Sequence, residues 1–385
     1  MFRCCLMLAL CAMGGLAMAA GPRARDLGIP FDGSPGPLNA ITDVAGVTVG
    51  QVTLIRDLPD GHKVRTGVTA ILPRGKASYE LPAFGGWFAL NGNGEMTGTT
   101  WLEESGQLEG PVMLTNTHSV GVVRDAVIAE RVHAGGADAS GYWWSLPVVA
   151  ETWDGELNDI NGFHVHAADA AKALHEAKGG PVAEGNVGGG TGMICHEFKC
   201  GIGTASRRVH IGERDYTLGV LVQANYGLRD SLRIAGVPVG QYLRDDRLYS
   251  ATDPAAVDTG SIIIVVATDA PLLPHQLKRI ARRAGMGLAR MGSYSGNGSG
   301  DIFLAFSTAN AEALHDRPLQ QASFIGNDHI DPLFEATVQA AEEAIVNAMI
   351  AAKDMCGEGG HCAKAIPHAE LVALLKRFGR YQPAH

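Results

Sequence analysis

The sequence predicts a mixed fold of the α/β or α+β class, in which layers of β-sheet are covered by helices. Short apolar runs rich in β-branched residues alternate with segments of helical composition along most of the 385 residues. Hydrophobic residues make up 46% of the chain and charged residues 18%, which is typical of a globular protein with a sizeable core. The fifty glycines follow no period, which excludes collagen-like and low-complexity structures.

The expected elements follow a turn-rich segment at residues 23–50. The helix at 164–178 is expected to stop at Gly179-Gly180, and Pro332 stands in the first turn of the last helix, where proline is tolerated. In chain order, the expected strands and helices are strand 66–73, strand 111–116, helix 164–178, strand 216–227 with its end at Asn225, strand 262–267, a helix along 277–288, strand 301–307 and helix 331–353.

Residues 1–19 are expected to be a secretory signal peptide. Arg3 is followed by an apolar stretch and then by the small-residue pattern Ala17-Met18-Ala19, after which cleavage is expected. No other stretch of the sequence approaches the length and apolarity of a membrane span. The remaining chain, 20–385, is expected to be a single exported domain, located in the periplasm if the source is a Gram-negative bacterium.

Charge and cysteine usage narrow the function further. The formal net charge is −9 and no basic run is present, which argues against a nucleic-acid partner. Cys195, Cys200, Cys356 and Cys362 remain after the signal is removed, and an even number in an oxidising compartment favours one or two disulfides. The local pairings are Cys195–Cys200 and Cys356–Cys362, although spacing alone leaves the connectivity open. The spacings match no standard zinc pattern, so no metal is expected.

The boundary between Gly260 and Ser261 supports two hypotheses. Residues 241–260 are polar, whereas residues 262–267 form the continuous β-branched run of a strand buried on both faces. The simpler hypothesis is a turn that leads into this strand. The alternative is a chain cut between Gly260 and Ser261, which would leave an N-terminal serine on a rigid strand. An α-amine has a pKa near ~7.7–8.0 and could take the proton of the serine hydroxyl without a histidine.

Such a serine needs an oxyanion donor and a polar group nearby. Asn225 at the end of one expected strand, and Ser299 and Asp301 at the start of another, are the candidates. The glycine-rich residues 185–193 lack the spacing of a dinucleotide or phosphate loop and are interpreted as either a flexible or a closely packed loop. Ser119 lies in a weak match to the nucleophile elbow of α/β-hydrolases, with threonine in place of the first glycine.

Seven blocks of this sequence resemble the DmpA-type aminopeptidases, which include L-aminopeptidase/D-amino-acid esterase/amidases and β-peptidyl aminopeptidases. The resemblance runs in order through most of residues 22–375. It implies an α+β fold, a four-layer α/β/β/α sandwich similar to the N-terminal-nucleophile hydrolases but with different connectivity. The resemblance also implies that the protein needs no cofactor. It further implies that the processed units assemble into a homo-oligomer, namely a tetramer. The blocks are RARDLGI, PGPLNAITDVAGV, LPVVAET, GPVAEGNVGGGTGM, GVLVQAN, VVATDAPLLPHQL and GSGDIFLAFS.

The resemblance also implies roles for individual residues. The precursor would cut itself between Gly260 and Ser261 into an α chain, 20–260, and a β chain, 261–385, with Ser261 as nucleophile. Asn225 would donate to the oxyanion. Ser299 would relay a proton and Asp301 would hold Ser299 and the α-amine, although the α-amine or Ser299 could be the general base.

Two further residues match the substrate-binding part of the family. Glu151 would pair with the free amino group of a short peptide, amide or ester substrate, and Trp153 stands where some relatives have a tyrosine and would shape the pocket. The preference for L-α, D-α or β-amino residues stays open. The alternatives are a non-catalytic secreted binding protein on the same scaffold and an α/β-hydrolase-type esterase using Ser119.

Overall fold

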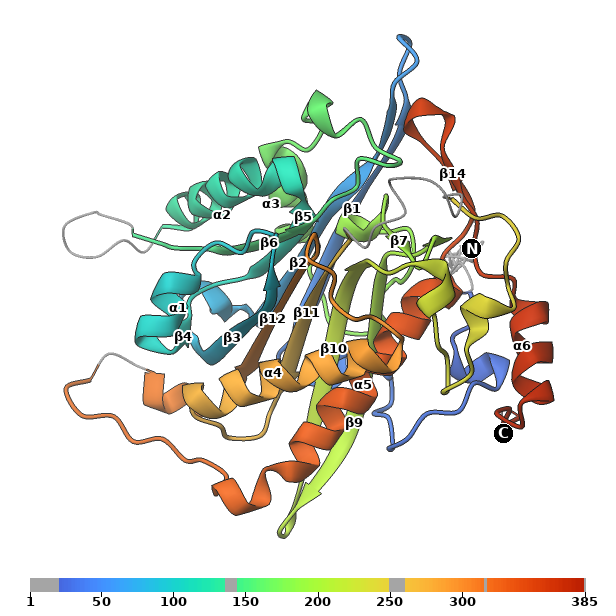
Figure 1. Cartoon of the computed structure of the whole chain (residues 1–385). Coiled ribbons are helices and arrows are strands. Elements are labelled where there is room, and N and C mark those ends of the chain that lie inside the picture. Colours follow the sequence, from blue (N-terminus) through green and yellow to red (C-terminus); the bar gives the residue numbers. More distant parts are fainter. Residues whose placement is uncertain (1–20, 136–143, 249–259, 315–316, 384–385) are drawn as a thin grey trace, which may run out of the picture.

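The computed structural model describes residues 21–135, 144–248, 260–314 and 317–383, and it shows two β-sheets packed face to face between two layers of helices (Figure 1). One sheet has four strands in the order β1-β2-β5-β6, and the other has six strands in the order β4-β3-β12-β11-β10-β9. Neighbouring strands are antiparallel except for the pairs β5–β6 and β11–β12, which are parallel. The expected α/β/β/α sandwich is therefore confirmed.

The bounds of the elements are as follows. The four-stranded sheet consists of β1 Thr48–Asp57, β2 Lys63–Lys76, β5 Val112–Asn116 and β6 Val148–Thr152. The six-stranded sheet consists of β3 Ala83–Gly92, β4 Gln107–Leu108, β9 Ile202–Ile211, β10 Arg214–Asn225, β11 Ser261–Thr268 and β12 Gly300–Ser307. The helices are α1 Thr99–Ser105, α2 Val120–Ala134, α3 Ala167–His175, α4 Pro274–Arg290, α5 Asp331–Ala351 and α6 His368–Arg377. Two small hairpins are β7 Ile194–Cys195 with β8 Phe198–Lys199, and β13 Met355–Cys356 with β14 Cys362–Ala363.

Three hydrophobic clusters fill the three spaces between the layers. One lies between the two sheets, one between the four-stranded sheet and α2 and α3, and one between the six-stranded sheet and α4 and α5. Strand β11 contributes to two of them: its even residues from Ile262 to Val266 face the helices, and its odd residues from Ile263 to Ala267 face the other sheet. Both faces are buried, which explains the unbroken apolar run in the sequence.

Most elements expected from the sequence are present. The five expected strands correspond to β2, β5, β10, β11 and β12, and the three expected helices correspond to α3, α4 and α5. Helix α3 is shorter than expected, and α5 ends at Ala351 rather than at Lys353. The signal peptide expected at 1–19 lies outside the described residues. Within the described part of the chain, no helix is long and apolar enough to cross a membrane.

Both local disulfides form. The Cys195–Cys200 bridge closes the β7–β8 hairpin, and the Cys356–Cys362 bridge closes the β13–β14 hairpin. Of the two alternatives for the glycine-rich loop, the structure shows the closely packed one, because a Cβ atom on Gly190 would lie 2.4 Å from the backbone nitrogen of Ile202. This loop therefore serves packing between strands.

Candidate active site

The register of the six-stranded sheet brings Ser261 next to Asn225, the expected oxyanion donor. In the antiparallel pair β10–β11, Ser261 lies directly opposite Asn225, and in the parallel pair β11–β12 it lies opposite Gly300. Ser261 and Ile263 are two residues apart in β11, so their side chains lie on the same face of the strand. Ile263 faces the space between the two sheets. The serine hydroxyl is thus presented at the end of the sandwich, on the side that faces the four-stranded sheet.

The hydroxyl of Ser261 is held by the neighbouring strand. The backbone nitrogen of Gly300 donates a hydrogen bond of 3.1 Å to Ser261 Oγ. The two sequence neighbours of Gly300 are joined to each other, because Ser299 Oγ donates a hydrogen bond of 2.7 Å to Asp301 Oδ1. Ser299 and Asp301 are 1% and 0% exposed, so this bond lies in a largely dry environment. The two residues expected at this strand start, Ser299 and Asp301, therefore flank the residue that contacts Ser261.

The side-chain amide of Asn225 has one fixed orientation. Its Oδ1 accepts from the backbone nitrogen of Ile194 at 2.8 Å, and its Nδ2 donates to the backbone oxygen of Trp153 at 2.8 Å. These two bonds distinguish the oxygen from the nitrogen of the amide. Because Nδ2 carries two protons, its second N–H can serve an oxyanion at Ser261.

Glu151 approaches the same region from the four-stranded sheet. It lies on β6, is 3% exposed, and accepts hydrogen bonds from the backbone nitrogen of Glu95 at 2.9 Å and from the Thr117 hydroxyl. Burial raises the pKa of the Glu151 carboxyl, and the hydrogen bonds from Thr117 and Glu95 oppose that shift. A buried carboxylate of this kind is chemically suited to pair with an ammonium group.

Gly94 lies between this carboxylate and the strand start that contacts the serine hydroxyl. A Cβ atom on Gly94 would lie 3.2 Å from Glu151 Oε1 and also 3.2 Å from the Cα atom of Gly300. Since the Gly300 nitrogen contacts Ser261 Oγ, the carboxylate and the hydroxyl lie in the same region, on either side of Gly94 and Gly300.

Trp153 lies at the mouth of this region rather than at the reacting atoms. Its side chain is 44% exposed, while its backbone oxygen accepts the bond from Asn225. A pocket-shaping role thus fits Trp153 better than a chemical one. Gly260 lies against the end of β10, where a Cβ atom would be 2.3 Å from the backbone oxygen of Asn225.

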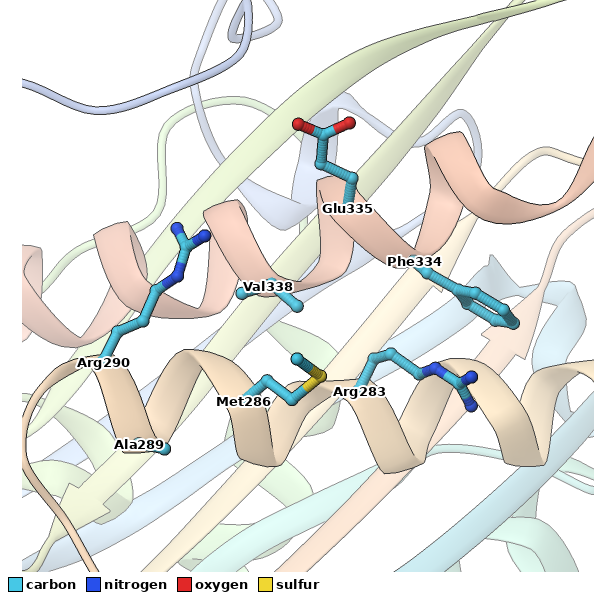
Figure 2. A pocket seen from close by; sticks show the side chains of 7 residues that line it. All are labelled: Arg283, Met286, Ala289, Arg290, Phe334, Glu335 and Val338. Carbon is cyan, nitrogen blue, oxygen red and sulfur yellow. The ribbon is translucent and has the colours of Figure 1, made fainter.

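Neither of the other two candidate regions competes with this one. Ser119 is 2% exposed and lies between β5 and α2, at the start of that helix. A groove of about 560 Å³ lies between α4 and α5 on the outer helical layer and is lined by Met286, Phe334 and flanking side chains (Figure 2). None of the expected site residues lines this groove.

Several groups of the site were not expected from the sequence. The backbone nitrogens of Glu95, Ile194 and Gly300 and the hydroxyl of Thr117 all contact expected site residues. Backbone donors leave no signal in residue type, and Thr117 is separated from Glu151 by many residues in the chain. Among the described residues, no group of three or more His, Cys, Asp or Glu side chains could hold a metal ion.

Comparison with known sequences identifies close relatives of this chain. The model of peptidase family S58 matches residues 39–363. The chain is 54% identical to the beta-peptidyl aminopeptidase BapA of Sphingosinicella microcystinivorans, over 97% of this chain and 96% of that protein. It is 47% identical to the BapA of Sphingosinicella xenopeptidilytica, over 96% of this chain and 95% of that protein.

Solved structures with the same fold include two enzymes. The L-aminopeptidase D-Ala-esterase/amidase of Ochrobactrum anthropi, described as a prototype for the serine aminopeptidases and a new variant of the Ntn-hydrolase fold, matches with a TM-score of 0.87 and 50% identity. It covers 94% of this chain and 99% of its own. The beta-aminopeptidase of a Burkholderia species matches with a TM-score of 0.84 and 49% identity, covering 93% of this chain and 99% of its own. These matches contradict an α/β-hydrolase esterase using Ser119 and do not favour a non-catalytic binding protein.

Proposed function

This chain belongs to peptidase family S58 and is an aminopeptidase of the Ntn-hydrolase fold. On this basis we propose that Ser261 is its nucleophile. The observation that carries the proposal is the strand register, which sets Ser261 between Asn225 and Gly300. A nucleophile on the central strands of a sheet is held rigidly, as covalent catalysis requires.

We propose that the chain activates itself. Ser261 Oγ would attack the carbonyl carbon of Gly260, and the acyl group would move from the Ser261 nitrogen to its oxygen. Water would then hydrolyse this ester, releasing the Gly260 carboxylate and freeing both the hydroxyl and the α-amine of Ser261. The products are an α chain, 20–260, and a β chain, 261–385. Strand β11 lies between β10 of the first chain and β12 of its own, so the sheet would hold the chains together.

In the mature enzyme, Ser261 Oγ would attack the carbonyl carbon of the substrate while its proton passes to the α-amine. Ser299 supports this route, because its own proton is directed to Asp301 and its oxygen can accept from the amine. Asn225 Nδ2 would donate to the resulting oxyanion. Collapse of the tetrahedral intermediate expels the leaving group, which takes up the proton, and water then hydrolyses the acyl-enzyme.

The substrate class follows from Glu151. A buried carboxylate that lies beside Gly94 and close to the strand start contacting Ser261 favours substrates with a free N-terminal ammonium group. We propose that N-terminal β-amino residues are among those released, because the relatives that are 54% and 47% identical are both beta-peptidyl aminopeptidases. The exposed Trp153 side chain would border the substrate at the mouth of the site.

Export of the enzyme is a further proposal. The expected signal peptide at 1–19 and the two disulfides both fit an oxidising compartment such as the periplasm.

Three experiments test the proposed function together. N-terminal sequencing of the purified small chain should read Ser-Ile-Ile-Ile-Val, and Ser261→Ala should give an uncut, inactive chain. Release of p-nitroaniline should be compared for β-homoalanine, L-alanine and D-alanine derivatives. A small chain with another first residue would contradict the nucleophile, whereas turnover of the α-amino derivatives alone would contradict only the β-amino proposal.

A further inference from the structure

A disulfide-closed hairpin supports the side chain of the proposed oxyanion donor. Ile194, which donates its N–H to Asn225 Oδ1, is the first residue of β7, and the next residue, Cys195, forms the disulfide with Cys200. The hairpin is also attached to the end of β10 by the His196 nitrogen, which donates to the Tyr226 oxygen at 2.8 Å. The position of the Ile194 N–H therefore depends on the shape of this hairpin.

Lys199 fixes the two ends of the hairpin from inside. Its Nζ donates to the backbone oxygen of Met193 at 2.6 Å and to that of Cys200 at 2.7 Å. Met193 immediately precedes Ile194, so this bond holds the peptide unit whose N–H reaches Asn225. The side chain of Lys199 is fully buried, and burial lowers its pKa well below the ordinary value for lysine. A neutral amine still has two N–H donors, so both bonds can persist in either protonation state.

We propose that the Cys195–Cys200 disulfide and Lys199 are positioning groups for catalysis, which hold the Ile194 N–H so that the Asn225 amide points its free N–H at the oxyanion. This inference rests on the proposed role of Asn225. The disulfide and the lysine touch no substrate atom and act only through the hairpin.

The geometry favours this role over simple stabilisation of the fold. A disulfide that closes a short loop removes less entropy from the unfolded chain than one that closes a long loop, so the global stabilisation expected from this bridge is at the lower end of the usual range. The chain also contains a matched bridge, Cys356–Cys362, which closes a loop of nearly equal length: the sequence separations are 5 and 6. The Cys195–Cys200 bridge is fully buried next to Asn225, whereas Cys356 and Cys362 are exposed.

The test compares the two bridges. Cys195→Ala/Cys200→Ala should lower kcat by roughly 10–100-fold, the order expected from a misplacement of about 1 Å in a catalytic group, with little change in KM. Cys356→Ala/Cys362→Ala should leave kcat unchanged. The melting temperature and the fraction of chain cut should be measured for both variants, and kcat should be expressed per cut enzyme.

A double-mutant comparison separates positioning from a general structural effect. In an Asn225→Ala background, removal of Cys195 and Cys200 should cause no further loss of kcat, because the group that they position is already absent. Lys199→Met should show the same two features, a loss of kcat in the native background and none in the Asn225→Ala background.

Three results would overturn the inference. The first is an equal kcat for the two disulfide variants, and the second is an additive loss of kcat when Cys195 and Cys200 are removed in the Asn225→Ala background. The third is a folded Cys195→Ala/Cys200→Ala chain that is not cut, while the Asn225→Ala chain is cut. If Asn225→Ala itself keeps normal turnover, the proposed oxyanion donor is wrong, which is a different failure.

Discussion

Ser261 and Asn225 face each other across the antiparallel pair β10–β11, at the last residue of one strand and the first of the other. Directly opposite residues in such a pair keep their side chains in contact distance on one face of the sheet. The two residues would belong to different chains after the proposed cut, yet seven further residue pairs of the same ladder hold their strands in register. The geometry of the site should therefore survive processing.

Asn225→Ala should separate processing from turnover. The oxyanion formed during the cut is on Gly260, whereas in turnover it is on the substrate, so the two need not use the same donor. We expect Asn225→Ala to be cut, although slowly, and to lose roughly 10²–10³-fold in kcat, as for removal of one oxyanion donor elsewhere. The cut fraction is followed by denaturing gel over time, and kcat is measured on the cut enzyme.

Asn225→Asp is the matched variant of that experiment. It keeps the size and the acceptor that faces Ile194, but it places an oxygen where Nδ2 now donates to Trp153. The loss of kcat should be at least as large as for alanine. Near-normal turnover by either cut variant would mean that Asn225 serves only to cap the strand.

Gly260→Ala should slow the cut without affecting the cut enzyme. A Cβ atom at this position would lie 2.3 Å from the Asn225 oxygen and 2.4 Å from the Tyr226 Cα atom, so the backbone of the precursor must shift. After the cut, residue 260 is a chain end and can move away. The rate of appearance of the small chain should fall, while kcat per cut enzyme should match that of the native protein. Normal processing would show that the precursor accommodates the shift easily.

Ser299→Ala and Asp301→Asn should both lower turnover. The Ser299 hydroxyl donates to Asp301 Oδ1 in a buried pair, and an amide at 301 could turn its nitrogen toward Ser299 and redirect that hydroxyl. Loss of a proton route typically costs about 10²–10⁴-fold. The measurement is kcat on cut enzyme, and the double variant is the control. If the two residues act as one unit, kcat of the double variant should be no lower than kcat of the less active single variant.

The sequence allowed most of the chemistry-bearing side chains to be predicted, because they stand at strand ends that hydrophobic patterns mark. The unbroken apolar run after Ser261 and the end of the β10 pattern at Asn225 are examples. Elements with weaker patterns, such as β1 with its exposed second half and the five-residue β6, were not expected. The support of the site also escaped prediction. The Ile194 and Gly300 nitrogens act through the backbone, and their placement depends on register and on a hairpin whose disulfide could be named only as a local pairing.

Glu151→Gln should weaken substrate binding more than chemistry. Glutamine keeps the acceptor for the Glu95 nitrogen but removes the charge that would pair with a substrate ammonium group. We expect KM to rise by about 10–100-fold, the equivalent of one lost charged hydrogen bond, with the cut at Gly260 intact. N-acetylated substrates should react slowly with the native enzyme, and the preference for free amines should largely disappear in the variant. Equal turnover of acetylated and free-amine substrates by the native enzyme would contradict an amine-binding role.

The pKa shift of Glu151 also predicts a stability change with a definite sign. Burial raises the pKa of this carboxyl in the folded protein above that of an unfolded chain, so the folded state favours the protonated form. The stability associated with that form is complete below the unfolded pKa, near ~4.3, and is lost as pH rises through the folded pKa. At pH 7 the buried carboxylate therefore costs folding free energy that a neutral glutamine avoids.

Glu151→Gln should raise the melting temperature of the free enzyme at pH 7, and this difference in melting temperature should shrink steadily as the pH is lowered toward 4. Melting curves of both proteins at matched scan rates across pH 4–8 measure this, with Glu213→Gln as the control, since the Glu213 side chain is exposed and does not act on the Glu151 carboxyl. A Glu151→Gln protein that is less stable at pH 7, or equally shifted at all pH values, would show that the carboxylate is well compensated in the free enzyme and is not held ready for an ammonium group.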